Sequence, residues 1–541
     1  MARTTTKPAD TAVERSATPK SKAKAVRAAR PKSARATLRL YRHGVGDCHL
    51  LTVPRAEGKP FHMMIDCGLL LGGDKKMLEK AVRDIIEKTD GRVDVLVVTH
   101  EHWDHVSGFV DCRDLFAVPK KDDQRGRLSV DSVWMAWTEN PEEEGAQAWE
   151  RERQERKKKL KAAAAQAKKL AADGSTDTTG LGDLLGFFGV SGAELGSPFA
   201  AGDKVGGTGE AFEIARSLAS KEQVYCRPSK WTPYSPEKLP GMRIYALGPP
   251  DTLDEIKRLI REGEVYHQEK AAAQDHAMAL LDEALFGAAG LGDLVVADPD
   301  RREDHHAPFD PAYCFSLATL YAQTSAAPGS AGADEATLRR FLADHYMEVD
   351  TTLPRQFDGW RRIDTDWLMS AQGFGLQLDN MTNNTSLALA IEFGADGPVL
   401  LFAADAQVGN WLSWHDRVWN VDDGKGGTRF VTGKDLLRRT TFYKVGHHGS
   451  HNATLKQKGV ELMENDDLVA FIPVNQDHAK KMRWNHMPLP ALIKALEERS
   501  AGRVLRSDQE PTAEAQAAFG NGTFKLTIDP LYFELSFDWP R

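Results

Sequence analysis

The sequence predicts a layered α/β protein, and three observations lead to this prediction. Short apolar runs rich in β-branched residues alternate with helical stretches, which is typical of sheets covered by helices. Four of the apolar runs lead into histidine or aspartate, so we expect these side chains along one edge of a sheet. A hydrophobic fraction of 41% and a charged fraction of 27% fit a compact core and argue against a fibre or a membrane bundle.

The first 36 residues are predicted to form a disordered basic tail. They hold ten basic and two acidic residues, a local net charge of +8, which leaves −16 for the remainder of a chain whose net charge is −8. The tail lacks the apolar segment of a secretory signal. It either tethers nucleic acid or another anionic surface or has no specific role, and the acidic remainder is not an obvious nucleic-acid platform.

The body is predicted to begin with three short strands and a helix. We expect the strands at 37–41, 48–53 and 61–65 and the helix at 75–87. Residues 93–98 (VDVLVV) then form a continuous β-branched run, typical of a strand that is buried on both faces.

Two insertions are predicted to interrupt the remaining strands. They lie at about 116–240 and 251–381, and the first contains a charged helix from about 141 to 173. Between and after the insertions we expect strands at 242–247, 386–393, 399–403, 441–445 and 468–474.

Cysteine usage and hydropathy predict a cytoplasmic protein. Five cysteines occur without any C-x-x-C spacing, which favours a reducing compartment over a disulfide framework or a thiolate metal site. No stretch approaches the ~18 uncharged apolar residues of a spanning helix, so we expect no membrane partner.

The loop after strand 93–98 contains the candidate metal ligands. It holds His100, His102, Asp104 and His105 within six residues. One metal can bind His100 and His102, while Asp104 and His105 project to a second position. Imidazole and carboxylate suit zinc, manganese or iron, and two adjacent metals with open positions serve hydrolysis. The alternative, a surface loop that is rich in histidine by coincidence, fits poorly with the buried strand before it.

The segment VDVLVVTHEHWDHVSGF resembles the H-x-H-x-D-H signature of the metallo-β-lactamase superfamily. Asp66 in MIDCG and Asp405 in LLFAADA resemble two further superfamily positions. Three stretches, NTS at 384–386, KVGHHGS at 444–450 and NHMP at 485–488, resemble the β-lactamase-like domain of bacterial competence DNA-uptake proteins. The matching positions cover roughly residues 37–112, 242–250 and 384–541. The insertions have no counterpart, and the membrane part of those uptake proteins is absent, so we expect no transport role.

The resemblance implies an αββα sandwich over residues 37–541, with two long, largely helical insertions as a cap that selects the substrate. It also implies roles for single residues. His100 and His102 would hold the first metal, Asp104 and His105 would hold the second, and Asp405 would bridge them. Asp66 would orient the loop of residues 99–105 that holds these ligands, called the metal loop below.

Three further histidines complete the implied site. Gly248-Pro249-Pro250 stands where the superfamily usually has another histidine for the first metal, so one of His447 and His448 is expected to replace it. We assign His448 to the metal and His447, with Asp104, to catalysis, although either histidine could be the ligand. His486 is expected to complete the second metal, with His478 as its competitor.

The expected cofactors are two divalent metal ions, zinc by default and manganese as the alternative. The expected reaction is hydrolysis of a phosphate ester, above all a phosphodiester, by a hydroxide that bridges the metals. The substrate could be nucleic acid. Hydrolysis of a lactone, carboxylic ester or amide is the alternative, and a non-catalytic binding module is the alternative of another class. The sequence leaves the oligomeric state open.

Overall fold

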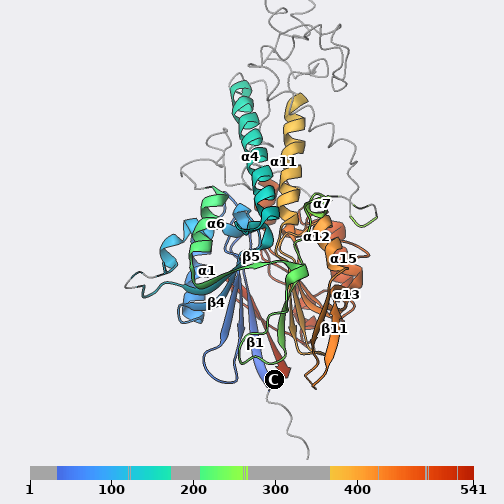
Figure 1. Ribbon diagram of the computed structural model, residues 1–541. Helices are drawn as coiled ribbons and strands as arrows, with labels where there is room; N and C mark the ends of the chain where they lie inside the picture. Colours follow the sequence, from blue (N-terminus) through green and yellow to red (C-terminus); the bar gives the residue numbers. More distant parts are fainter. Residues whose placement is uncertain are drawn as a thin grey trace, which may run out of the picture. The chain divides into compact units, whose positions relative to one another are not determined.

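Two sheets packed face to face form the centre of the protein, seen in a computed structural model (Figure 1). The structure describes residues 33–171, 207–265 and 366–540, apart from positions 120, 122, 123, 260, 262, 425, 482, 483, 485, 486 and 521. All of them belong to one unit that runs from residue 33 to the end of the chain.

The first sheet has the strand order β15-β16-β1-β2-β3-β4-β5-β6. Its strands from β15 to β3 are antiparallel, and those from β3 to β6 are parallel. The strands are β1 (Ser33–Tyr41), β2 (His49–Val53), β3 (Phe61–Ile65), β4 (Arg92–Val97), β5 (Ser129–Ala136), β6 (Ala219–Cys226), β15 (Lys525–Ile528) and β16 (Tyr532–Pro540).

The second sheet has the strand order β14-β13-β12-β9-β8-β7, parallel from β14 to β9 and antiparallel beyond. Its strands are β7 (Met242–Ala246), β8 (Leu389–Phe393), β9 (Val399–Phe402), β12 (Thr440–Lys444), β13 (Val469–Ile472) and β14 (Val504–Arg506). A separate hairpin pairs β10 (Val418–Asp422) with β11 (Thr428–Thr432).

Alternation along the strands divides the core into three layers. Val95 and Val97 of β4 face the cluster between the sheets, where Leu400 and Phe402 of β9 meet them. The intervening Leu96 faces an outer cluster instead. An equivalent outer cluster covers the other sheet. The protein is therefore an αββα sandwich, as the sequence predicts.

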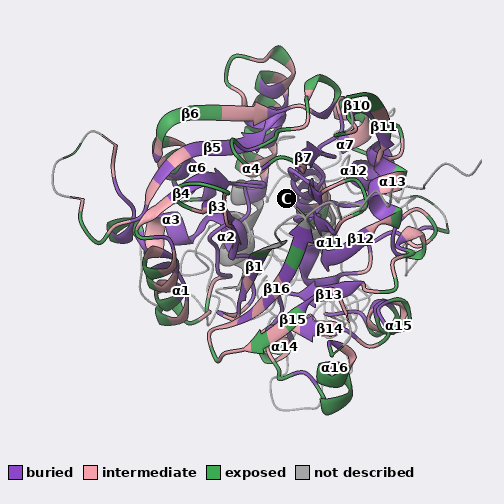
Figure 2. Cartoon of the chain, turned by 90° about the horizontal axis from the view of Figure 1, so that it is seen from below, coloured by how far each residue is buried: buried purple, intermediate pink, exposed green. Residues whose placement is uncertain are grey.

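Helices cover both outer faces, with α1, α3 and α6 on one side and α12, α13 and α15 on the other (Figure 2). The helices are α1 (Lys75–Lys88), α2 (Trp103–Val106), α3 (Gly108–Asp111), α4 (Glu144–Ala171), α6 (Thr208–Ser217), α7 (Leu253–Ile256), α11 (Asp366–Asn384), α12 (Val408–Trp414), α13 (Gly433–Arg438), α14 (Gln476–Lys481), α15 (Pro490–Arg499) and α16 (Ala513–Ala518).

Two boundaries differ from the sequence-based expectation. Strand β1 begins at Ser33, inside the predicted tail, because it pairs with β16 along its whole length. The first predicted insertion contains β5 and β6, which extend the first sheet. Pairing with segments far away in the sequence decides both boundaries.

The two longest helices among the described residues come from the predicted insertions. Helix α4 matches the charged helix predicted at 141–173, and α11 lies beside it (Figure 1). Arg156 of α4 donates a hydrogen bond to Gln377 of α11 over 3.1 Å, and its guanidinium lies 5.4 Å from the Phe374 ring. Within the described residues, no helix is both long and apolar enough to cross a bilayer.

Candidate metal centre

Three strands deliver the candidate ligands from their carboxyl ends. His100, His102, Asp104 and His105 follow β4, Asp405 follows β9, and His447 and His448 follow β12. Strand β4 belongs to one sheet, and β9 and β12 belong to the other. The site therefore lies where the carboxyl ends of strands from both sheets meet. This placement agrees with the general position of sites at the carboxyl ends of parallel strands.

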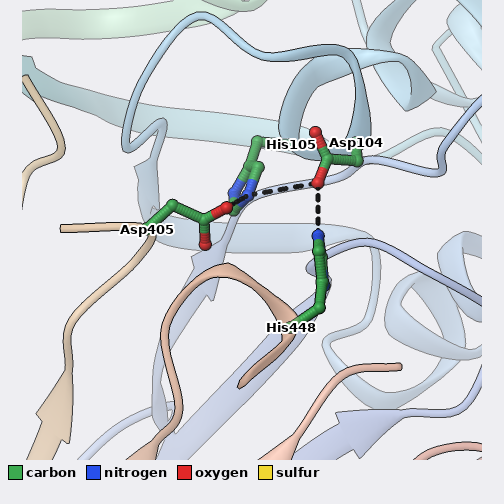
Figure 3. A group of neighbouring side chains, drawn as sticks. All are labelled: Asp104, His105, Asp405 and His448. Carbon is green, nitrogen blue, oxygen red and sulfur yellow. Dashed lines mark hydrogen bonds and ion pairs between the residues drawn. The ribbon is translucent and has the colours of Figure 1, made fainter. Parts of the chain in front are cut away.

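Four side chains from these strand ends form a tight group (Figure 3). One donor atom from each of Asp104, His105, Asp405 and His448 lies within 4.8 Å of the others, and all four residues are buried. His448 Nε2 lies 2.6 Å from Asp104 Oδ2, and His105 Nε2 lies 3.2 Å from Asp405 Oδ2. Two imidazoles and two carboxylates thus point to one place.

His100 and His102 form a second pair of donors beside this group. His100 Nε2 lies 3.2 Å from His102 Nδ1, so these two nitrogens face each other. The His100 ring is 4.2 Å from the His105 ring, measured between centroids. The pair therefore adjoins the four-residue group, as two neighbouring metal positions require.

The donor set fits divalent metal ions. Buried polar atoms normally have hydrogen-bond partners, yet Asp104 Oδ1 has none within the described residues. Asp405 Oδ2 also makes no hydrogen bond there, although His105 Nε2 is 3.2 Å away. These lone pairs are available to a cation, and a mixture of imidazole and carboxylate suits zinc or manganese.

Three of the histidines are neutral at neutral pH because burial disfavours their charged form. Burial lowers the pKa of His102 to about 3 and the pKa of His447 to about 4, and it holds the pKa of His100 well below the usual value. Neutral imidazole is the form that binds a metal, so these residues need not release a proton first.

The two histidines next to the carboxylates behave in the opposite way. Burial opposes the protonation of His105, but Asp405 and Asp104 raise its pKa well above the usual value. Burial likewise opposes the protonation of His448, and its hydrogen bond to Asp104 raises its pKa. The two carboxylates thus favour a positive charge at this position, and a bound metal ion would supply that charge.

Asp66 makes hydrogen bonds to two residues of the metal loop, Thr99 and His105. Its Oδ2 lies 2.8 Å from His105 Nδ1, and the same carboxylate accepts hydrogen bonds from the backbone and hydroxyl of Thr99 over 2.8 and 2.7 Å. The contact fixes the His105 ring and turns Nε2 toward Asp405. This is the position that the sequence suggests for an orienting residue.

Asp405 is held by groups other than the histidines. Its Oδ1 accepts hydrogen bonds from Lys444 Nζ over 3.1 Å and from the His447 backbone over 2.9 Å. Ser386 Oγ accepts from the Asp405 backbone over 3.3 Å, which gives the NTS stretch a structural role. Lys444 also pairs with the buried Asp47 over 2.5 Å. Oδ1 is therefore occupied, and Oδ2 is turned to the site.

The paired histidines have different surroundings. Both have a positive φ, 44° for His447 and 51° for His448, a conformation that non-glycine residues rarely adopt. This turn sends His448 to Asp104, while His447 Nδ1 lies 2.8 Å from Ser450 Oγ. The structure thus places His448 within the four-residue group and His447 beside it.

Of the two remaining histidine candidates, the structure describes only His478. His486 and its neighbour Asn485 lie outside the described residues, so the role of His486 stays a prediction. His478 on α14 is partly buried and contacts the backbone of Leu71. Within the described part of the chain, the groups of possible ligands do not include His478.

Sequence reasoning did not identify two buried acids, Glu101 and Asp379, as neighbours of the site. Glu101 lies between two candidate ligands and is buried, and its carboxylate pairs with Arg153 over 2.7 Å and with Lys157 over 2.6 Å. Helix α4 is therefore anchored on the metal loop. Asp379 of α11 lies against His102. No local pattern reveals these contacts, because each one joins the metal loop to a distant insertion.

Comparison with known proteins agrees with this geometry. Residues 46–121 match the family model of the metallo-beta-lactamase superfamily, a range that includes the whole metal loop. The comparison therefore identifies a metallo-beta-lactamase superfamily domain at residues 46–121, as the sequence predicts. No curated protein matches the chain, so the resemblance to the competence DNA-uptake branch stays a prediction.

Proposed function

We propose that the protein is a metal-dependent hydrolase of phosphodiesters. The observation that carries the proposal is the convergence of Asp104, His105, Asp405 and His448, with carboxylate oxygens left for a cation. The choice of phosphodiester rests on the resemblance of KVGHHGS and its companion stretches to the competence branch. The same ligands can serve ester, lactone or amide hydrolysis, because a fold and a ligand set do not fix the substrate.

In this proposal the ligands divide into two sets that share Asp405. His100 and His102, whose Nε2 and Nδ1 face each other, would hold the first metal, and Asp104, His105 and His448 would hold the second. His486 would add to the second set. Two divalent ions, zinc by default and manganese as the alternative, supply Lewis acidity and lower the pKa of water.

His447 assists the leaving group or a phosphoryl oxygen. Asn452 donates to Gln407 Oε1 over 2.9 Å, and this contact turns the Gln407 amide nitrogen toward His447 Nδ1, 3.4 Å away. Ser450 Oγ, which donates to Asn452 Oδ1 over 3.2 Å, lies 2.8 Å from the same nitrogen, and these contacts together fix the orientation of the His447 ring. Asp104 helps to orient the attacking water.

A substrate panel tests the proposal. The metal-loaded protein is given bis(p-nitrophenyl) phosphate, p-nitrophenyl acetate and a simple lactone, next to the His447→Gln variant. We expect hydrolysis of the phosphodiester above all and a lower kcat in the variant. Hydrolysis of the lactone or acetate alone would favour the other hydrolase class. A protein that binds metal and hydrolyses none of the three would favour a binding module.

A further inference from the structure

Asp379 brings a third carboxylate to the metal loop from a distant part of the chain. It lies on α11, which belongs to the second predicted insertion, and it is only 3% exposed. Its Oδ1 lies 3.6 Å from His102 Nε2, and its Oδ2 accepts from Asn383 Nδ2 over 3.3 Å. One oxygen is thus held by its own helix, and the other faces the histidine.

The two nitrogens of His102 face different partners. Nδ1 faces His100 Nε2 over 3.2 Å, which is the side of the proposed first metal. Nε2 faces Asp379 on the opposite side of the ring. Histidines that bind a metal commonly donate their other ring nitrogen to a carboxylate, which fixes the tautomer and the ring orientation. Asp379 occupies the place of that carboxylate.

The charges around Asp379 support a role toward a cation. The buried Asp379 adds its carboxylate to the nearby carboxylates of Asp104 and Asp405. No lysine or arginine of the described residues forms an ion pair with it. A buried acid without a basic partner costs stability, so its presence at this position calls for a function.

Helix α11 is held firmly enough to position this side chain. Asn380 Oδ1 accepts from Asn452 Nδ2 over 3.1 Å, and Gln377 accepts from Arg156 of α4. Helix α4 is itself anchored on Glu101, the residue before His102. The two insertion helices therefore meet the metal loop at consecutive residues.

We propose that Asp379 is a positioning residue of the metal centre, whose carboxylate faces His102 Nε2 over 3.6 Å and keeps His102 Nδ1 turned toward the first metal. The inference rests on the proposed two-metal function and extends it. The second insertion is then part of the metal centre as well as a cap. Loss of this carboxylate weakens one of the two metal positions and leaves the other intact.

The test compares Asp379→Asn, which keeps the shape, and Asp379→Leu, which removes all acceptors, with wild type. Gln377→Ala is the matched control, because it loosens the contact between α11 and α4 without touching His102. Binding of Co²⁺ is measured by competition with a chelator, together with the visible spectrum of bound Co²⁺ and the Tm of the metal-free protein.

We expect the affinity for one of two Co²⁺ ions to fall roughly 10–100-fold in both Asp379 variants, with a changed spectrum. The metal-free Tm of Asp379→Asn should equal or exceed that of wild type, since a buried acid is removed. Gln377→Ala should lower the Tm and leave the affinities unchanged.

Wild-type affinities and spectra in both Asp379 variants would overturn the inference, as would equal losses in the Gln377 control. A wild type that binds no Co²⁺ would overturn the inference and the proposed function together. A wild type that binds two Co²⁺ ions but hydrolyses no phosphodiester would overturn the proposed function alone, and the affinities would still decide the role of Asp379.

Discussion

Replacement of Glu101 by glutamine should destabilise the protein far more than an ordinary surface change. Glu101 and Arg153 are each 3% exposed, and the carboxylate accepts charged hydrogen bonds from Arg153 and Lys157. In Glu101→Gln, Arg153 keeps Glu139 and Glu150, but Arg153 and Lys157 lose the buried acid that they share. Removal of one partner from a buried ion pair typically costs about 3–5 kcal/mol.

The pKa of Glu101 gives a second value for the contribution of this ion pair to the free energy of unfolding. Burial alone would raise this pKa, but the charges of Arg153 and Lys157 lower it from the usual 4.5 to about 2. At about 1.4 kcal/mol per pH unit, this difference corresponds to about 3 kcal/mol. The stabilisation is complete above pH 4.5 and is lost as the pH falls toward 2, because a lowered acid pKa favours the folded state only while the acid is ionised.

The assay is urea unfolding of the metal-free protein at pH 7.5, followed by tryptophan fluorescence. Glu150→Gln is the matched control, since Glu150 pairs with the same Arg153 but its side chain is 43% exposed. We expect a loss of about 3 kcal/mol in Glu101→Gln and less than about 1 kcal/mol in the control. Equal losses in the two variants would refute the claim that α4 is anchored on the metal loop through a buried charge.

Three other variants test separate parts of the account. Burial lowers the pKa of His62 from 6.5 to about 4, so protonation of this residue favours the unfolded state. As the pH falls from 6.5 to 4, His62 should therefore lower the free energy of unfolding of the wild type by up to about 3 kcal/mol. His62→Gln should flatten this part of the stability profile, and an unchanged profile would contradict it. Lys444→Met leaves Asp47 and Asp405 buried without their shared cation, and the metal-free protein should lose about 3–5 kcal/mol in urea unfolding; a loss below 1 kcal/mol would contradict this. His447→Gln should lower kcat about 10²–10⁴-fold while metal content stays at the wild-type level, and a loss of metal would instead make His447 a ligand.

The sequence reveals the parts of the fold that depend on local patterns. The continuous apolar run before His100 predicts β4, and the runs before Asp405 and His447 predict β9 and β12. Because each run ends in possible ligands, the meeting of these residues at one edge could be foreseen. Their convergence within a few ångströms follows from the way the two sheets pack.

Contacts between distant segments could not be foreseen in this way. The start of β1 depends on its pairing with β16 at the other end of the chain, and β5 and β6 are hidden within a long stretch without any family resemblance. Asp379 is more than 270 residues away from His102 in sequence, and only the packing of α11 brings them together. The choice between His447 and His448 depends on a turn with two positive φ angles, which no spacing rule predicts.

The metal content of the purified protein tests the central claim most directly. Mass spectrometry of the protein after loading with Zn²⁺ or Mn²⁺ should give close to two metal ions per chain, and Asp405→Ala should retain one or fewer, because Asp405 is proposed to serve both positions. Wild type with no bound metal, or Asp405→Ala with the full wild-type content, would contradict the account of these residues as a two-metal centre.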